Sequence, residues 1–223
     1  MALTLARLVA KIIAGFIALT LLLVLAFKWI PVPVTATMVM DEHGITKDWE
    51  TLANIDPNLV HAVIAAEDSK FCEHSGFDTE AIEQALAERE ETGRVRGAST
   101  ISQQTAKNVF LWQGGGWFRK AFEAWFTFWI ELVWCKARIM EVYLNVAETG
   151  IGTYGAEAGA QRYFGHPAAR LTPDEASRMA AALPSPKKRE VRNPGGWLAR
   201  HGNSIERRIV IVKRDGLAAC VYE

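Results

Sequence analysis

The longest apolar stretch of the chain lies near its N-terminus, where residues 12–27 carry no charge between Lys11 and Lys28. With residues 8–10 before it and Trp29 and Ile30 after it, the stretch reaches the roughly 20 residues that a helix needs to span a bilayer. The two lysines can extend to the headgroups on either side. This pattern predicts an uncleaved transmembrane anchor over residues 1–30.

A cleaved signal peptide is the alternative to an anchor. The stretch is longer than the apolar part of a signal peptide, about 7 to 15 residues, and no small-x-small cleavage site follows it directly. Arg7 and Lys11 favour a cytoplasmic N-terminus, although Lys28 weakens that bias. Both alternatives place the rest of the chain outside the cytoplasm. We therefore expect a single-pass protein of the cytoplasmic (inner) membrane whose domain faces the periplasm or cell exterior.

The remainder of the chain has mainly helical spacing. Pro31 and Pro33 stop the first helix, and residues 31–56 lack a strong period, which predicts a stalk. Apolar spacing then predicts one all-α or mostly α domain over residues 57–223, without internal repeats and with few strand patterns. The first expected helix runs from residue 57 into residues 65–68, and the third runs from a cap at Ser99 or Thr100 to about residue 111. The other expected helices cover residues 79–91, 117–145, 171–183 and 203–214. A basic loop at 93–97 and three glycines at 114–116 separate some of them.

Composition excludes several classes of function. The 25 basic and 25 acidic residues balance, so no overall field attracts nucleic acid, and a site for a polyanion must be local. Half of the residues are hydrophobic, which excludes a disordered chain. Cys72, Cys135 and Cys220 are too few for a disulfide framework; at most one bridge can form, and nothing in the pattern favours it. The five histidines form no H-E-x-x-H motif, so no catalytic zinc is expected.

Adjacent carboxylates follow an entirely apolar helical segment at residues 62–66. A carboxylate at the end of such a helix is partly desolvated, which raises its pKa and suits a general base or acid. Glu67 and Asp68 are therefore candidates for catalysis. The alternative is a pair of helix-end charges in water.

Two further polar clusters could bind an anion. Hydroxyls and free N–H groups at the start of the helix after Ser99 favour an anion, and Gln104 and Lys107 share a face of that helix. Arg119 and Glu123 share another helix face, where the arginine could hold a phosphate oxygen. The alternatives are a solvated polar face and a surface ion pair.

Eight aromatic residues fall between positions 117 and 134. Glu123 and Glu131 argue against a second membrane span, and an interfacial helix or a buried core helix remain as interpretations. Two motif matches are rejected. The G-x-G-x-x-G match at 150–155 follows a helix rather than a strand, and the S-x-x-K match at 185–188 lies among prolines with no K-T-G after it.

Taken together, these segments resemble glycosyltransferase family 51, the peptidoglycan glycosyltransferases, over about residues 57 to 200. The matching positions are Glu67, Asp68, Phe71, His74, Gly76, Gly97, Thr100, Gln103, Gln104, Lys107, Asn108, Arg119, Lys120, Glu123, Lys136, Arg138, Glu141, Tyr143, Asn145, Glu148, Gly150, Gly152, Tyr154, Gly155 and Pro184. Ala98 and Ser102 are mild departures from the pattern. No transpeptidase domain follows, so this chain alone is not expected to cross-link peptides.

The resemblance implies a lysozyme-like helical lobe, a small membrane-facing jaw, and lipid II as both donor and acceptor. It implies that Glu67 is the general base for inverting transfer, which forms a β-1,4 bond and releases undecaprenyl diphosphate. Lys107 and Arg119, assisted by Lys120, are expected to hold the donor diphosphate, because a diphosphate leaving group needs charge stabilisation more than protonation.

The resemblance also implies supporting roles. Thr100 and Gln104 match positions that line the donor site. Glu123 matches the family's second glutamate and is expected as the second catalytic residue, which orients the cations or helps to hold a divalent ion, Mg or Mn, on the diphosphate. The residues expected to support Glu67 or shape its loop are Asp68, Phe71, His74 and Gly76. The expected partners are the growing glycan strand, the membrane and other cell-wall synthesis or division proteins.

Two other functions are compatible with parts of the pattern. A lysozyme-like hydrolase or lytic transglycosylase would also use a buried glutamate, but it would not need Lys107 and Arg119 beside it. A non-catalytic scaffold would tolerate loss of Glu67. The basic residues Lys187, Lys188, Arg189 and Arg192 either meet anionic headgroups or substrate, or form a solvated surface.

Overall fold

The computed structural model describes residues 2–93 and 97–222, so residues 94–96 of the expected basic loop lie outside the described residues. The fold is mostly helical, as the sequence predicts. The helices are α1 (Ala2–Phe27), α2 (Ala36–Val39), α3 (Pro57–Glu67), α4 (Thr79–Thr92), α5 (Ile101–Phe110), α6 (Gly116–Val133), α7 (Lys136–Val146), α8 (Ala156–Phe164), α9 (Pro173–Ala182), α10 (Gly196–Arg214) and α11 (Ala219–Tyr222). The strands are β1 (Thr46–Lys47), β2 (Glu148–Gly150) and β3 (Thr153–Tyr154), and short 3₁₀ turns cover Leu52–Asn54 and Ala168–Arg170.

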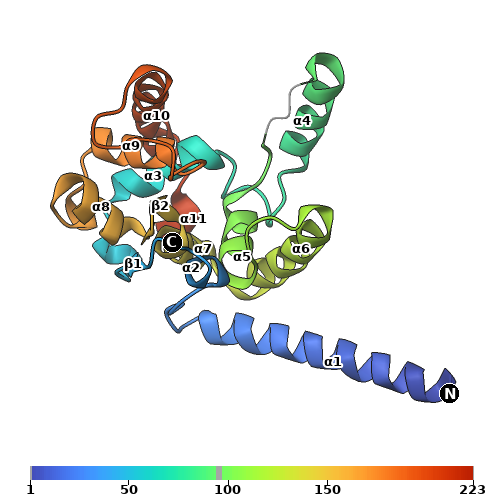
Figure 1. Cartoon of the computed structure of the whole chain (residues 1–223). Helices are drawn as coiled ribbons and strands as arrows, with labels where there is room; N and C mark the ends of the chain where they lie inside the picture. Colours follow the sequence, from blue (N-terminus) through green and yellow to red (C-terminus); the bar gives the residue numbers. More distant parts are fainter. Residues whose placement is uncertain (1, 94–96, 223) are drawn as a thin grey trace.

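The larger lobe is built around α3. All residues from 59 to 65 are buried, and α9 and α10 pack against this helix (Figure 1). Asp56 caps it by accepting a hydrogen bond from the Asn58 N–H at 2.9 Å, and Pro57 occupies its first turn. A helix that is apolar on every side must be covered on every side, so α3 lies in the centre of the lobe.

The smaller lobe consists of α5 and α6, and α1 runs along it. Phe16 contacts Phe122 with ring centroids 5.7 Å apart, and the Trp125 indole donates to the Thr20 hydroxyl at 3.3 Å. Near the C-terminal end of α1, the Trp134 indole donates to the carbonyl oxygen of Val24 at 2.7 Å. Residues 3–27 are long and apolar enough to cross a membrane, with a mean hydropathy of 2.7, and few residues of that stretch are buried.

Helix α6 is not an ordinary core helix. Glu123, Phe126, Thr127 and Ile130 are buried, and Phe122 and Trp125 contact α1, but Trp117 is 87% exposed. Phe118, Phe128 and Leu132 are exposed as well. Exposed aromatic side chains next to an apolar anchor favour the interfacial interpretation over the core interpretation.

Residues 31–56 differ from the stalk predicted by their lack of period. Val32 and Met38 are fully buried, and β1 pairs with β3 in a three-stranded sheet of order β1-β3-β2. The Glu50 N–H donates to Asn145 Oδ1 at 2.8 Å. The segment therefore packs on the domain through single anchoring side chains, which leave no periodic signal.

Two helix boundaries predicted from the sequence are wrong. The expected helix over 117–145 is broken by extended backbone at Trp134 and Cys135 into α6 and α7. The last long helix begins at Gly196 rather than at 203. The G-x-G-x-x-G match lies in the hairpin of β2 and β3 and the start of α8, and not at a strand-to-helix phosphate loop.

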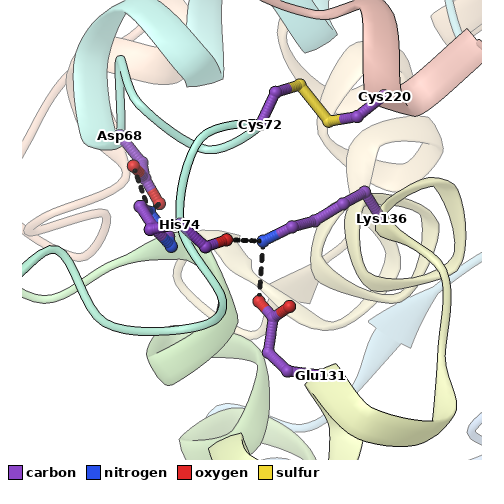
Figure 2. Close-up of a disulfide and its surroundings, with 6 residues drawn as sticks. All are labelled: Asp68, Cys72, His74, Glu131, Lys136 and Cys220. Atoms are coloured by element: carbon purple, nitrogen blue, oxygen red, sulfur yellow. Dashed lines mark hydrogen bonds and ion pairs between the residues drawn. A yellow bond between two sulfur atoms is a disulfide. The ribbon is translucent and has the colours of Figure 1, made fainter.

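One disulfide joins Cys72, in the loop after α3, to Cys220 in α11, 148 residues later (Figure 2). Nothing in the sequence pattern favoured this bridge, because no spacing rule connects cysteines that lie so far apart. Cys135 is a free, exposed cysteine. The bridge fastens the loop that follows Glu67 to the end of the described chain.

Candidate active site

Glu67 is the last residue of α3. Burial raises its pKa, as the sequence predicts for a carboxylate at the end of an apolar helix. The amide of Gln104 on α5 opposes this effect, because Nε2 donates a hydrogen bond to Glu67 Oε2 at 2.7 Å. The charges of Arg189 and Lys107 also lower the pKa. The site therefore holds a partly desolvated carboxylate with one donor and nearby positive charge, an arrangement suited to a general base.

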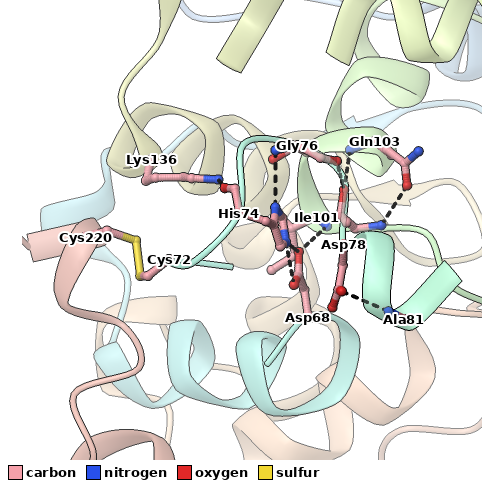
Figure 3. Close-up of polar contacts among 12 residues, drawn as sticks. Asp68, Cys72, His74, Gly76, Asp78, Ala81, Ile101, Gln103, Lys136 and Cys220 are labelled. Carbon is pink, nitrogen blue, oxygen red and sulfur yellow. Dashed lines mark hydrogen bonds and ion pairs between the residues drawn. A yellow bond between two sulfur atoms is a disulfide. The ribbon is translucent and has the colours of Figure 1, made fainter. Parts of the chain in front are cut away.

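Asp68 holds the loop that follows Glu67. Its Oδ1 lies 2.9 Å from His74 Nε2, and its Oδ2 accepts a hydrogen bond from the Ile101 N–H at 3.0 Å (Figure 3). His74 Nδ1 accepts from the Gly76 N–H at 3.2 Å, so the ring proton lies on Nε2 and faces Asp68. These contacts of Asp68, His74 and Gly76 tie the loop to the start of α5.

Phe71 and Lys136 also hold the loop that follows Glu67. Phe71 is fully buried, and Lys136 Nζ lies 4.5 Å from the centre of its ring. Lys136 Nζ also donates to the carbonyl oxygen of His74 at 2.7 Å and lies 2.8 Å from Glu131 Oε1 (Figure 2). This connection between α7, α6 and the loop was not assigned from the sequence.

Thr100 differs from its expected place in the donor site. It is buried, and its hydroxyl donates to the carbonyl oxygen of Gly76 at 2.7 Å and accepts from the Gln103 N–H at 3.1 Å. The Gln103 side chain in turn accepts from the Thr100 N–H at 3.0 Å, which completes a capping box. The Thr100 hydroxyl therefore starts α5 and anchors the loop, while Gln104, one residue after Gln103, reaches Glu67.

Glu123 on α6 holds two of the expected cations. It is only 2% exposed; Arg119 Nη1 donates to its Oε2 at 2.6 Å, and Lys120 Nζ pairs with its Oε1. Lys120 also donates to the Ser99 hydroxyl at 3.1 Å. Glu123 thus directs both side chains to the same place, which matches the expected role of orienting the cations.

Lys107 on α5 is the third cation. Within residues 2–93 and 97–222 no hydrogen bond or ion pair engages its amine, and burial lowers its pKa. A half-buried ammonium group without an anionic partner is costly, and an anion bound beside it would offset that cost.

These groups share one cleft of about 460 Å³ between the lobes, which we call the catalytic cleft. Its polar lining includes Glu67, Gln104, Lys107, Arg119, Lys120 and Glu123. Three cations thus face two carboxylates, that of Glu123 on α6 and that of Glu67 on α3. The net charge of these five groups, with all of them ionised, is positive. The residues predicted as base and diphosphate clamp therefore meet in a single site.

The lining does not resemble a protein site for a divalent metal ion. In the described part of the chain, no three His, Cys, Asp or Glu side chains gather as metal ligands. Both oxygens of Glu123 are engaged by Arg119 and Lys120. We therefore assign no residue of this chain to a Mg or Mn ion, and an ion on the diphosphate would depend on the diphosphate for its ligands.

Tyr143 and Arg189 lie beside the site; the sequence assigned no role to Tyr143 and considered Arg189 only as one of four basic residues that could meet headgroups or substrate. Tyr143 is buried beneath Gln104, with its hydroxyl 3.5 Å from Gln104 Oε1. Arg189 is close enough for its charge to lower the pKa of Glu67, although its Nη1 donates to the carbonyl oxygen of Ala181 at 2.5 Å. Tyr143 could have been noticed because it lies in one of the family-like segments.

The chain is similar to known proteins of one family. A family model described as Transglycosylase matches residues 35–214. The biosynthetic peptidoglycan transglycosylase of Caulobacter vibrioides is 52% identical over 201 residues, which cover 89% of this chain and 88% of that protein. A protein of the same name from Rhodospirillum centenum is 47% identical over 221 residues, covering 97% and 96%. Another, from Pseudomonas putida, is 47% identical over 215 residues, covering 92% and 91%. The resemblance inferred from the motifs is confirmed, and the chain belongs to the transglycosylase family.

Proposed function

We propose that this protein is a peptidoglycan glycosyltransferase that polymerises lipid II into β-1,4-linked glycan strands and releases undecaprenyl diphosphate. The observation that carries the proposal is the catalytic cleft, in which the partly desolvated Glu67 faces Lys107, Arg119 and Lys120. The names of the relatives, which describe biosynthetic peptidoglycan transglycosylases, support the same reaction.

In this proposal Glu67 is the base. Its carboxylate takes the proton from the 4-hydroxyl of the acceptor sugar as that oxygen forms a bond to the anomeric carbon of the donor. Gln104 holds the carboxylate in place through its 2.7 Å hydrogen bond, which favours the ionised form against the effect of burial. Attack from the face opposite the leaving group inverts the anomeric centre, which converts an α-linked donor into a β-linked product.

Lys107, Arg119 and Lys120 serve the leaving group. As the bond between the anomeric carbon and the diphosphate breaks, its electron pair passes to the diphosphate oxygen. Cations already fixed in position stabilise this developing charge without reorganisation. Glu123 supplies the fixation, because it holds Arg119 and Lys120 while remaining buried itself.

The proposed location is the outer face of the cytoplasmic membrane, with α1 as the anchor. Disulfides persist mainly in oxidising compartments, so the bridge between Cys72 and Cys220 supports a domain outside the cytoplasm. The exposed aromatic residues Trp117, Phe118 and Phe128 of α6 support a position of this helix in the headgroup region beside α1. That position brings the catalytic cleft close to a lipid-linked substrate.

The test is polymerisation of purified lipid II by the full-length protein in detergent, with wild type compared with Glu67→Gln. We expect long glycan strands from wild type and at least about a hundredfold lower rate from the variant, the usual scale for loss of a general base. Glu73→Gln is the matched control, because Glu73 is an exposed glutamate in the same loop. Near-normal polymerisation by Glu67→Gln would remove the mechanism, and cleavage of finished glycan without polymerisation would favour a hydrolase.

A further inference from the structure

A second, smaller recess opens on the other side of Glu67. It has a volume of about 150 Å³, and its polar lining includes Glu67, Ser69, Asp78, Gln84, Ser99 and Arg208. We call it the Arg208 recess. It shares Ala66, Glu67, Gly97 and Ser99 with the catalytic cleft, so Glu67 lies at the boundary between the two. A sugar seated beside Glu67 could therefore extend a substituent into the recess.

Arg208 on α10 is an arginine without a partner. Its Nε is fully buried and has no hydrogen bond, and in the described part of the chain no carboxylate or carbonyl oxygen engages the rest of its guanidinium group. Burial is the cause that lowers its pKa, with no acidic side chain opposing it. Other arginines with partly buried side chains have partners: Arg138 donates to the carbonyl oxygen of Phe27 at 2.8 Å, and Arg189 to that of Ala181 at 2.5 Å.

Neither of the two aspartates that border the recess pairs with Arg208, because both contact other groups. Asp68 is used by His74 and by the N–H of Ile101. Asp78 Oδ1 accepts the N–H of Ala81 at 2.9 Å and caps α4 (Figure 3). A half-buried guanidinium group at a substrate site, with a buried Nε that has no partner, is most simply explained by a ligand that completes it, since a buried donor left unpaired is costly.

Size and charge restrict the ligand. A single guanidinium group matches a single carboxylate, which it can bind through two parallel hydrogen bonds. The more highly charged diphosphate is matched by the three cations of the catalytic cleft. At about 150 Å³ the recess is much smaller than the catalytic cleft of about 460 Å³, which suits a carboxylate and its adjoining atoms better than a further sugar.

We propose that Arg208 binds a carboxylate of the peptide attached to the muramic acid residue of lipid II, and so selects substrates whose peptide is charged. This inference rests on the proposed function, which supplies lipid II as the substrate. Arg208 would act in recognition and would leave the chemistry to Glu67. No sequence motif pointed to it, because its position beside Glu67 depends on the packing of α10 against α3.

The experiment compares two substrates, lipid II with free peptide carboxylates and lipid II in which each of these carboxylates is an amide. Wild type is expected to show a KM about tenfold or more lower for the free-carboxylate substrate, the scale of a hydrogen bond between charged groups. Arg208→Met, which keeps an unbranched apolar stem, should raise the KM for that substrate by a similar factor. It should leave kcat and the kinetics with the amidated substrate nearly unchanged.

Arg207→Met is the matched control, because Arg207 is the exposed neighbour on the same helix, and it should not alter the preference. Arg208→Lys keeps a charge but loses the planar pair of donors, and we expect part of the preference to remain. If Arg208→Met does not fold, the preference of wild type and of Arg208→Lys decides the question. Equal KM values for the two substrates in wild type, or an equal loss with both substrates in either variant, would overturn the inference. Failure of wild type to polymerise either substrate would instead reject the proposed function.

Discussion

The side-chain amide of Gln104 connects a buried phenol to the carboxylate of Glu67. Gln104 Nε2 donates to Glu67 at 2.7 Å, while its Oε1 lies 3.5 Å from the hydroxyl of Tyr143. Burial raises the pKa of Tyr143 well above its ordinary value, so the hydroxyl keeps its proton and can act as a donor. A donor on that side fixes the amide with its oxygen toward Tyr143 and its NH₂ group toward Glu67.

Removing this amide should change the pH dependence of polymerisation. In Gln104→Ala the carboxylate loses a donor that lowers its pKa, while the burial that raises the pKa remains. Glu67 must be ionised to act as a base, so the acidic limb of the kcat/KM profile should move to higher pH. Gln161→Ala, which removes an exposed glutamine that donates to Glu157 at 2.9 Å, is the control. If the acidic limb of the variant stays at the wild-type pH, Gln104 does not affect the pKa of Glu67.

Glu123→Gln tests whether Arg119 and Lys120 must be held in position, because the variant keeps both cations and removes the charge that pairs with them. The neutral amide cannot hold Arg119 and Lys120 as strongly, so we expect a higher KM for lipid II and a loss of about 1–3 kcal/mol in unfolding free energy, toward the low end because both cations can be rehydrated. Asp215→Asn breaks the exposed pair between Arg214 and Asp215, 2.6 Å apart, and should change neither quantity. Unchanged kinetics in Glu123→Gln would remove Glu123 from the clamp.

Gly76→Ala should damage the loop after Glu67. Gly76 has φ +89°, and a Cβ there would lie 2.7 Å from Thr127 Cγ2 and 2.9 Å from Glu131 Cγ. Backbone strain of about 1–2 kcal/mol and overpacking of about 1–3 kcal/mol should add. Gly44→Ala isolates the strain, because Gly44 has φ +80° with nothing within 4 Å. Equal urea midpoints for the two variants would mean that the close approach at Gly76 has no energetic effect.

Loss of the disulfide should destabilise the domain. A bridge that spans 148 residues constrains the unfolded chain strongly, and the chain-entropy model gives about 5 kcal/mol as an upper value. Cys72→Ser should therefore lower Tm markedly, and a reducing agent should lower the Tm of wild type but not that of the variant. Cys135→Ser, which removes the free cysteine, should leave Tm unchanged. A Tm of wild type that does not respond to reduction would contradict the predicted contribution.

Local signals account for the parts of the fold that were predicted correctly. The cap at Asp56, the capping box of Thr100 and Gln103 and the capping box of Thr172 each depend on residues within three positions of one another. Arg119 and Glu123 are one helical turn apart, so their pairing could also be predicted. The positions of Glu67 and Lys107 in one cleft came from the family resemblance.

Long-range contacts account for what the sequence did not predict. The break between α6 and α7 lies where the Trp134 indole reaches the carbonyl oxygen of Val24, 110 residues earlier. Strands of two or three residues, such as β1 and β2, are too short to show an alternating pattern. Arg208 reaches the site from a helix far from Glu67 in the sequence, so only the folded chain reveals its place.

The bridge between Cys72 and Cys220 closes a covalent ring around most of the domain. Helix α4 lies inside this ring and projects from the domain in Figure 1, where a protease could reach it. A single cut there would leave two pieces that remain attached and migrate together on a gel without reductant. A nicked molecule could therefore keep Glu67 and the cationic clamp on the same particle, and the two pieces would separate only after reduction of the bridge.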